Sequence, residues 1–376
     1  MRSISILGTR GVPARYGGFE TFAEALALYL EGRGWRVTVY CHDEGGGRRR
    51  QEIWHGVELV HLPSRLRGAA GTVEFDLKCT WDALRRGNCV NLVLGYNTAV
   101  FSLFYRLAGQ CNIINMDGLE WRRSKWSRPV RGWFYVNEWL GCWLGNRLVA
   151  DHPEIARHLA SRGVGKKVTM IPYGSEPVRS ADPALLGQFG LSAGGYVLLV
   201  ARAEPENSIL EIVSAFSARP RGVKLAVLGA YDRQVYQYHD QVMDAASQEV
   251  MFLGPVYDRT LLGALRFHAL AYCHGHRVGG TNPSLLEAMG AGNAVLAHDN
   301  AFNRWVAGDG ALFFSNEAEC AAGLDTLLAD TALRARAGEA SRARHAAMFT
   351  WPEVLESYER LLLECCGAKS ADATRR

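Results

Sequence analysis

The chain has 376 residues, of which 48% are hydrophobic and 21% are charged, and its formal net charge is +4. This length suggests two or three domains of roughly 150 residues each, and the composition is that of a folded globular protein. Intrinsic disorder and a multi-span membrane protein are excluded, and so small a net charge gives no reason to expect wrapping by nucleic acid.

The first half of the chain alternates short apolar runs with amphipathic segments. An apolar run at 3–7 is followed by a glycine-rich loop and by a helical pattern over 21–31. Further runs of strand length follow at 37–41, 57–62, 91–94, 112–115 and 147–150. The uncharged stretch 87–105 contains asparagine and glycine, so we interpret it as strand, turn and helix. Spacing of this kind predicts parallel strands joined by crossover helices.

The second half repeats this pattern. Its apolar runs lie at 196–201, 224–228, 250–253, 270–273, 294–297 and 311–313. The prolines and glycine of 171–183 stop regular structure and place a boundary near residue 174. We expect domains at 1–173 and 174–350, and a helical segment at 351–376 that packs back on the first domain. The predicted fold class is α/β, with two doubly wound, Rossmann-like domains.

The nine cysteines are scattered, and no two of them are spaced as Cys-x-x-Cys. This distribution predicts neither a zinc site nor a disulfide framework, and it favours reduced thiols in a cytoplasmic protein. The chain runs from Met1 directly into an apolar strand, without the basic start and the cleavage site of a secretion signal. Export is therefore not expected.

The first loop, GTRGVPARYGGFE at 8–20, places four glycines between a strand and a helix. Glycine lets backbone N–H groups approach an anion at a helix N-terminus, so Gly17 and Gly18 are candidates for binding a phosphate. Arg10 and Arg15 favour the same interpretation. The loop has neither the Gly-x-Gly-x-x-Gly nor the Walker spacing, and a turn that serves only packing is the alternative.

Arg202 and Asn207 follow the first strand of the second half, in the sequence ARAEPEN at 201–207. A guanidinium at the carboxyl end of a parallel strand can bind a phosphate with two hydrogen bonds. An arginine in this place is also commonly a solvated surface residue. This segment alone leaves both interpretations open.

A third candidate segment, HGHRVGGTNPSLLEAMGAG at 274–292, follows the run at 270–273. The residues that expose backbone N–H groups before its helix are Gly279, Gly280, Thr281 and Asn282. Glu287 lies about one turn inside the helix, where a carboxylate can accept hydrogen bonds from ribose hydroxyls. Together the segments predict a nucleoside-diphosphate site. His274 and His276 lack a third ligand, so a metal pair is not expected.

These segments resemble a known family. The two α/β halves, the glycine-rich loop after the first run and PSLLEAMGAG at 283–292 are similar to those of GT-B glycosyltransferases of family 4. The sequence at 8–21, with NMDGLEW at 115–121 and GTNPS at 280–284, resembles a narrower branch that includes rhamnosyltransferases of bacterial capsule and exopolysaccharide assembly. The resemblance covers residues 3–362. It implies a GT-B fold whose second domain binds the nucleotide sugar.

The resemblance implies roles for the donor-side residues. It puts Arg202 on the diphosphate and Glu287 on the ribose, with Asn207 and the loop 279–282 beside them. Two positions depart from the family pattern: Gly279 replaces the first of two paired glutamates, and Asn207 replaces a lysine. Loop N–H groups and Arg202 are then expected to stabilise the leaving diphosphate.

The acceptor-side candidates follow the run at 112–115. Family 4 enzymes often have a histidine there, whereas this chain has Asp117 and Glu120. We expect Asp117, with Glu120 behind it, to orient or deprotonate an acceptor hydroxyl; a capping aspartate is the alternative. The resemblance implies retention of configuration without a covalent protein intermediate. The sequence has no Asp-x-Asp motif, so neither a metal nor another cofactor is implied.

Cationic and aromatic residues are mixed in the segment 121–135. The candidates for contact with an acceptor or a membrane surface are Arg10, Arg15, Trp121, Arg122 and Trp126. Such a mixture suits the anionic cytoplasmic face of an inner membrane, where a lipid-linked glycan is presented. The alternative is a core helix with a solvated basic edge, and the rest of the chain shows no sign of nucleic-acid binding.

The sequence therefore predicts a glycosyltransferase, metal-independent and retaining, that acts in surface polysaccharide synthesis. The branch resemblance favours transfer of rhamnose from dTDP-rhamnose to a lipid-linked saccharide. A nicotinamide-dependent oxidoreductase is disfavoured because the dinucleotide fingerprint is missing. A nucleotide-sugar epimerase and a non-catalytic sugar-binding protein of the same fold stay open as alternatives.

Overall fold

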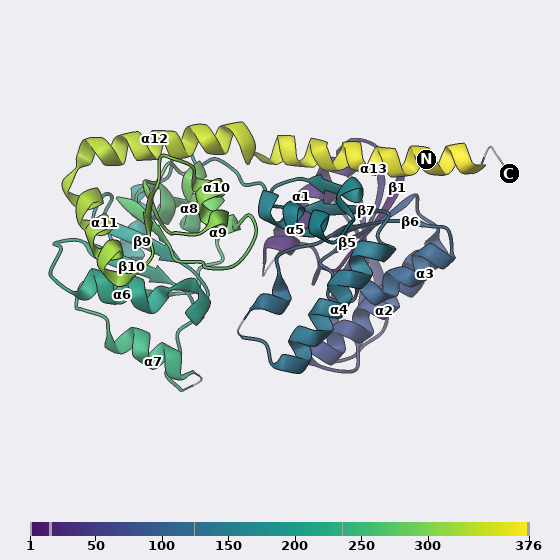
Figure 1. Cartoon of the computed structure of the whole chain (residues 1–376), viewed down its shortest axis with the longest axis horizontal. Coiled ribbons are helices and arrows are strands. Elements are labelled where there is room, and N and C mark those ends of the chain that lie inside the picture. The colour runs from purple at the N-terminus through teal and green to yellow at the C-terminus, as the bar shows by residue number, and fades with distance from the viewer. Residues whose placement is uncertain (1, 15–16, 124, 235, 374–376) are drawn as a thin grey trace. The chain divides into compact units, whose positions relative to one another are not determined.

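A computed structural model describes residues 2–14, 17–123, 125–234 and 236–373 (Figure 1). The chain forms two compact units, one made of residues 1–173 and 351–376 and the other of residues 174–350. Each unit has its own β-sheet and its own apolar core. In the described parts of the chain, no helix combines the length and the apolar character needed to cross a bilayer.

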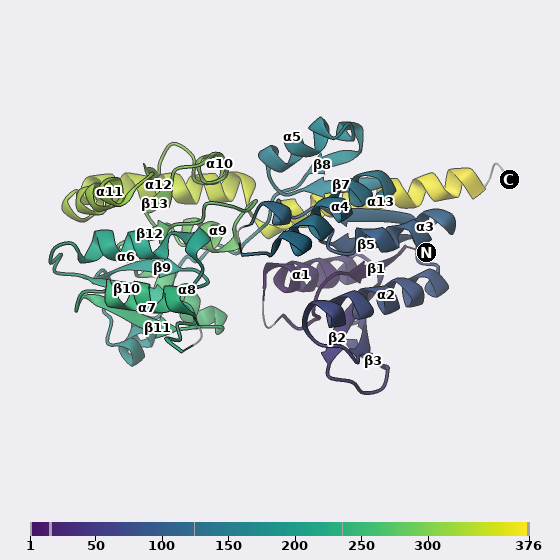
Figure 2. The same cartoon turned by 60° about the horizontal axis from the view of Figure 1, so that its bottom comes forward.

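The first unit contains an eight-stranded sheet with the strand order β3-β4-β2-β1-β5-β6-β7-β8. Its strands are β1 (Ser3–Leu7), β2 (Arg36–Glu44), β3 (Arg50–Trp54), β4 (Val57–Ser64), β5 (Val90–Leu94), β6 (Cys111–Asn115), β7 (Arg147–Ala150) and β8 (Val168–Met170). Its helices are α1 (Gly18–Gly32), α2 (Gly68–Arg86), α3 (Ser102–Leu107), α4 (Arg128–Leu144), α5 (Pro153–Ser161) and α13 (Trp351–Ala373). Only β3 pairs antiparallel, with β4, and β3 and β8 form the edges of the sheet (Figure 2).

Alternating residues of these strands build apolar layers on both faces of the sheet. Val39 and Leu92 point to the face covered by α1 and α13, whereas their neighbours Tyr40 and Val93 point to the face covered by α2 and α3. α3 contacts both α2 and α4, so these three helices form one layer. Side chains on the outer side of this layer therefore point away from the sheet.

The second unit contains a six-stranded parallel sheet with the order β11-β10-β9-β12-β13-β14. Its strands are β9 (Tyr196–Val200), β10 (Lys224–Leu228), β11 (Val250–Gly254), β12 (Ala271–His274), β13 (Val295–His298) and β14 (Leu312–Phe314). Its helices are α6 (Ile209–Ser217), α7 (Gln237–Asp244), α8 (Arg259–Phe267), α9 (Pro283–Gly290), α10 (Ala301–Ala307), α11 (Glu317–Ala329) and α12 (Thr331–Met348). The predicted α/β class with two doubly wound sheets is confirmed.

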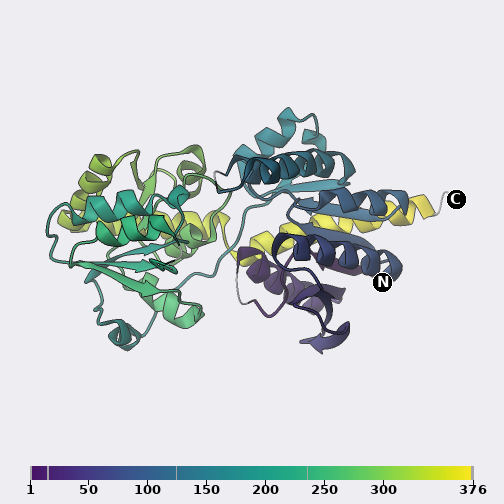
Figure 3. The same ribbon diagram turned by 90° about the horizontal axis from the view of Figure 1, so that it is seen from below.

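The last helix, α13, completes the core of the first unit (Figure 3). Its buried face contributes Trp351, Val354, Leu355, Tyr358, Leu361, Leu362 and Cys365. Glu359 of the same helix is also buried. Its carboxylate accepts hydrogen bonds from Tyr29 Oη, Arg33 Nε and Trp35 Nε1 over 3.0–3.1 Å. These bonds fix α13 to α1 and to the turn that follows α1.

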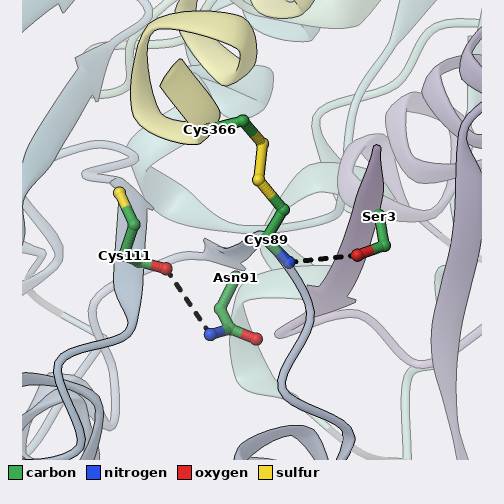
Figure 4. The surroundings of a disulfide bond; sticks show 5 residues. All are labelled: Ser3, Cys89, Asn91, Cys111 and Cys366. Atoms are coloured by element: carbon green, nitrogen blue, oxygen red, sulfur yellow. Dashed lines mark hydrogen bonds between the residues drawn. A yellow bond between two sulfur atoms is a disulfide. The ribbon is translucent and has the colours of Figure 1, made fainter. Parts of the chain in front are cut away.

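Cys89, directly before β5, forms a disulfide bond with Cys366 of α13 (Figure 4). Their Cα atoms lie 5.5 Å apart although 277 positions separate the residues in sequence. The prediction that the thiols are reduced is therefore wrong for this pair. No spacing motif reveals the bond, because the two cysteines meet only where α13 returns to the first sheet.

Candidate functional site

The carboxyl edge of the second sheet brings the predicted donor-side segments together. The chain moves outward from β9 through β10 to β11, and then returns to the other side of β9 with β12. Ligands of doubly wound sheets bind at such a topological switch point. The Arg277 N–H donates to the Glu206 carbonyl over 3.0 Å, so the segments after β9 and β12 touch. A Cβ on Gly275 would lie only 2.0 Å from the Asn207 carbonyl oxygen, so this approach requires glycine.

Arg202 is the exposed cation at this edge. Its side chain is 64% exposed, and its ion pair with Glu204 spans 3.7 Å, a geometry that contributes little in water. The guanidinium is therefore available to an anionic ligand. Asn207 is buried, and its Nδ2 donates to the Arg202 carbonyl over 2.8 Å. Asn207 shapes the turn that presents Arg202.

The loop before α9 is built around Gly279 and Asn282. Gly279 has a φ of +144°, which side chains disfavour. Asn282 caps α9: its Oδ1 accepts from the Ser284 N–H over 3.1 Å and from Ser284 Oγ over 2.9 Å. The Leu285 N–H donates to the Asn282 carbonyl over 3.1 Å. Because the amides of the first helical turn are satisfied, an anion here would be bound by the loop amides that precede Asn282, where Gly280 and Thr281 lie.

Glu287 forms an ion pair that sequence reasoning missed. Its Oε2 lies 2.5 Å from Nη2 of Arg266 on α8, and the side chains are 35% and 5% exposed. A buried guanidinium needs an anionic partner, so Glu287 neutralises Arg266 and Arg266 fixes the orientation of Glu287. The signal in the sequence was an arginine inside an apolar helical run, LLGALRF at 261–267.

His274 and His276 pack against each other. Their rings are stacked with centroids 4.4 Å apart and an interplanar angle of 7°. Complete burial lowers the pKa of His274 to about 3, which keeps its ring neutral. Within the described residues, no group of three or more His, Cys, Asp or Glu side chains is arranged to hold a metal ion.

The first loop is held by carboxylates of the helix that follows it. Glu20 is buried and accepts hydrogen bonds from the N–H groups of Arg10 (2.9 Å) and Gly17 (3.0 Å). Glu24 accepts one from the Ala14 N–H over 2.6 Å. These amides are bonded to carboxylates of the protein itself, and the nearby negative charge disfavours a phosphate at the same amides. The geometry therefore favours a packing role for Gly17.

The other candidates of this loop lie at its two ends. Gly18 is the first residue of α1, and Arg10 is exposed after β1. Arg15 lies outside the described residues. Sequence reasoning missed the carboxylate contacts, although Glu20 stands three residues after Gly17, which is the spacing of a capping box.

Asp117 lies two residues after the end of β6 and has a left-handed backbone conformation, with a φ of +47°. Its N–H donates to Asn115 Oδ1, and Asn115 Nδ2 donates to Tyr358 Oη, both over 2.9 Å. A positive φ is uncommon outside glycine and occurs where surrounding contacts impose it, often in functional sites. α13 therefore helps to fix Asp117 at the carboxyl edge of the first sheet.

Glu120 is buried and bonded at both carboxylate oxygens. Its Oε2 accepts from Trp126 Nε1 over 3.1 Å, and its Oε1 lies 2.7 Å from Arg123 Nε. Its N–H donates to Tyr96 Oη over 2.9 Å. This geometry gives Glu120 a positioning role in the segment after Asp117.

The predicted acceptor-side aromatics are packed rather than freely exposed. Trp121 Nε1 donates to the buried Glu138 carboxylate over 2.6 Å, and Trp126 is bonded to Glu120. Arg122 is exposed, with its guanidinium 5.0 Å from the centre of the Trp121 ring. The segment 121–126 thus has a packed side and a basic outer edge.

Comparison with known proteins gives matches for both parts of the chain. Residues 1–176 match the model of a domain of unknown function, DUF1972, and residues 192–344 match that of the glycosyl transferases group 1. The phosphatidyl-myo-inositol mannosyltransferase of Mycolicibacterium smegmatis is 33% identical over 201 residues, which cover 51% of this chain and 50% of that protein. The chain therefore spans about half the length of this curated relative.

Solved structures share the fold over the whole chain. Sucrose-phosphate synthase from Thermosynechococcus elongatus has a TM-score of 0.84 at 16% identity, covering 98% of this chain and 100% of that one. HepE of Anabaena, in complex with UDP and glucose, has a TM-score of 0.76 at 15% identity, covering 96% and 99%. At these identities the likeness concerns the fold alone. The chain therefore has a GT-B fold, whose second part resembles the group 1 glycosyltransferases and whose first part resembles the DUF1972 domain.

Proposed function

We propose that the chain transfers a sugar from a nucleoside-diphosphate donor, bound at the carboxyl edge of the second sheet, to an acceptor hydroxyl. One observation carries the proposal: Arg202 and the loop before α9 lie at the topological switch point, within the part that matches the glycosyltransferase model. Arg202 supplies positive charge, the loop amides supply hydrogen-bond donors, and Glu287 supplies acceptors for ribose hydroxyls.

These groups suit the charge changes of sugar transfer. Negative charge develops on the diphosphate as the bond to the sugar breaks, and the Arg202 guanidinium and the loop amides stabilise it. The acceptor oxygen attacks on the face from which the diphosphate departs, so configuration is retained, and a phosphate oxygen takes the acceptor proton. Asp117 orients the acceptor hydroxyl. No step of this mechanism requires a metal ion.

dTDP-rhamnose is the donor that we place first, because the loops at 8–21 and 115–121 resemble the rhamnosyltransferase branch. UDP-glucose is the second candidate, since HepE was solved with UDP-glucose and an Escherichia coli trehalose-6-phosphate structure with UDP-2-fluoro glucose. The acceptor that we place on the first unit is a lipid-linked saccharide of surface polysaccharide synthesis, at the cytoplasmic face of the inner membrane. The exposed Arg10 and Arg122 would attract its anionic groups.

Nucleotide release by the full chain tests the proposal. The panel contains dTDP-rhamnose, UDP-glucose and GDP-mannose, each with and without a lipid-linked acceptor extract. Release from one donor only when acceptor is present supports transfer and identifies the sugar. Conversion of a donor into its epimer without acceptor would establish the epimerase alternative, and tight binding without turnover would establish a binding protein.

Arg202→Ala tests the donor site. We expect kcat/KM to fall by about 10²–10³-fold, the usual effect of removing one stabilising donor. Arg336→Ala, an exposed arginine on α12, is the matched control and should keep wild-type turnover. Unchanged turnover in a folded Arg202→Ala variant would show that the donor diphosphate binds elsewhere.

A further inference from the structure

The outer side of α4 is apolar and open to solvent. Trp133, Val136 and Trp143 are exposed, with Trp143 at 67%, and their spacings of three and seven residues put them on one helix face. A shallow hollow of about 330 Å³ lies on this helix. It is lined by Tyr135, Val136, Trp139, Leu140, Trp143 and Leu144.

α3, which contacts α4 in the same layer (Figure 1), also exposes apolar side chains. Leu107 is 77% exposed, more than any other large apolar side chain in the described residues. We define the α3–α4 face as Leu103, Phe104, Leu107, Trp133, Val136, Leu140 and Trp143. Large exposed apolar patches on soluble domains mark interaction surfaces.

The part of the chain that carries this face is rich in cations. Between residues 97 and 167 the sequence has 11 Lys and Arg residues against 5 Asp and Glu. Two of the five acids, Glu120 and Glu138, are buried and paired with arginine. Arg106, Arg128 and Lys166 are exposed and have no acidic partner among the described residues. The solvent-facing charge of this region is therefore strongly positive.

The cations lie at both ends of α4. Arg128 begins the helix. At the other end, the Lys167 amino group donates to the carbonyls of Cys142 and Trp143. Burial and the positive charge of Arg106 on α3 lower the pKa of Lys167.

This combination fits the surface of an anionic bilayer. Tryptophan favours the headgroup level, aliphatic side chains enter the acyl boundary, and arginine and lysine pair with lipid phosphates. A second copy of the chain fits less well. A two-fold contact would place the same cations opposite one another, where they repel.

We propose that the α3–α4 face docks the first unit on an anionic lipid membrane. The inference rests on the proposed function, because it explains how the chain reaches a lipid-linked acceptor. It moves the membrane contact from Trp121 and Trp126, which are bonded to buried carboxylates, to side chains that sequence reasoning did not select.

Flotation of the full chain with vesicles tests the proposal. The vesicles contain phosphatidylcholine alone or phosphatidylcholine with 30 mol% phosphatidylglycerol, taken as about one anionic lipid in three. We expect binding to the anionic vesicles only, weakened by high salt. Leu107→Ser/Trp143→Ser and Arg106→Glu/Lys166→Glu should each weaken it by about tenfold or more.

The matched control variants have the same kinds of substitution at exposed residues outside the α3–α4 face. Ile53→Ser and Tyr257→Ser remove side chains that are exposed on β3 and in the second unit, and Arg336→Glu reverses a charge on α12. These variants should bind vesicles like the wild type. Equal binding by face and control variants, or no binding of the wild type to either vesicle, would overturn the proposal.

Sedimentation measures self-association of the same proteins. A dimer that dissociates in Leu107→Ser/Trp143→Ser would identify the face as a contact between copies and would also overturn the membrane proposal. Nucleotide release with a detergent-solubilised acceptor separates the two proposals. Face variants should keep this activity if both hold. If the chain binds vesicles through the α3–α4 face but turns over no donor, the docking proposal holds and the proposed function is refuted.

Discussion

At the scale of single residues, glutamates bonded within the protein, buried at Glu20 and Glu138 and half-buried at Glu287, organise the parts of this chain that matter for its site. Glu20 holds the first loop, Glu138 anchors Trp121, and Glu287 pairs with Arg266. Each carboxylate is stabilised by several donors or by a buried cation, as a charge in a protein interior must be. These residues position others, whereas the exposed Arg202 is free to meet a ligand.

Variants of the Arg266–Glu287 pair should separate its effect on the stability of the protein from its effect on donor binding. Glu287→Ala leaves the Arg266 guanidinium buried without its partner, and we expect it to lower the free energy of unfolding by about 3 kcal/mol. Glu287→Gln/Arg266→Met removes both charges and should recover most of that stability without restoring donor binding. Denaturant unfolding and the KM for the donor measure the two effects. Full activity in the double variant would rule out a role for Glu287 in donor binding.

At the scale of elements, one cluster joins α4, α5 and the segment that carries Trp121. The Glu138 carboxylate accepts from Trp121 Nε1 at 2.6 Å, from His158 Nε2 at 2.9 Å and from Arg162 Nη2 at 2.9 Å. Arg162 also stacks on Trp139, with its guanidinium carbon 4.3 Å from the ring centre. The inner side of α4 is thus fixed by polar contacts, which lets its outer side remain apolar.

This cluster predicts how stability depends on pH. Burial alone would raise the pKa of Glu138, but hydrogen bonds from His158, Trp121 and Arg162, together with the charge of His158, outweigh it and lower the pKa. The ionised Glu138 carboxylate therefore stabilises the folded protein. This stabilisation is complete above the unfolded-chain pKa of about 4.3 and is lost as pH falls through the lower folded-state pKa. Thermal melting should show Glu138→Gln less stable than wild type at pH 7. The difference should shrink below pH 4, and a constant difference would contradict the assignment.

The sequence was enough to predict elements that have strong local signals. It was not enough to predict contacts between residues that lie far apart in the chain. The apolar run before Gly8 predicted β1, and the Thr-Asn-Pro sequence ending at Pro283 predicted the start of α9, because strand hydrophobicity and helix capping are local properties. The partners of Glu20, Arg266 and Cys366 depend on how elements pack, which no local pattern specifies. The bond from Trp121, a predicted acceptor- or membrane-side residue, to Glu138 also depends on packing, so no local pattern could have predicted it.

At the scale of the whole molecule, the chain crosses from the first unit to the second once and then returns. The Ser175 N–H donates to the Phe349 carbonyl over 2.8 Å, and Ser175 Oγ lies 2.7 Å from His345 Nε2. The outgoing and returning segments are therefore tied together inside the second unit. The last helix then supplies one side of the first core, so the stability of that unit depends on a distant segment.

A variant of Glu359 tests how strongly the stability of the first unit depends on α13. Glu359→Ala leaves Trp35 Nε1 and Tyr29 Oη without their acceptor, and we expect it to destabilise the first unit by about 3 kcal/mol. Glu353→Ala, an exposed residue of the same helix, should have no effect. Hydrogen exchange should accelerate in α1 and α13 of the Glu359 variant while β9 and β12 keep wild-type protection. Faster exchange in both units would contradict the assignment of α13 to the first unit alone.

The return of α13 sets the order in which the protein is completed during synthesis. When residue 350 leaves the ribosome, the second unit has all of its sequence, whereas the first core still lacks the side chains from Trp351 to Cys365. The N-terminal part, though made first, finishes folding last, which reverses the usual vectorial order. Until α13 has been made, the unfinished apolar face of the first unit is the part of the nascent chain that a chaperone would bind.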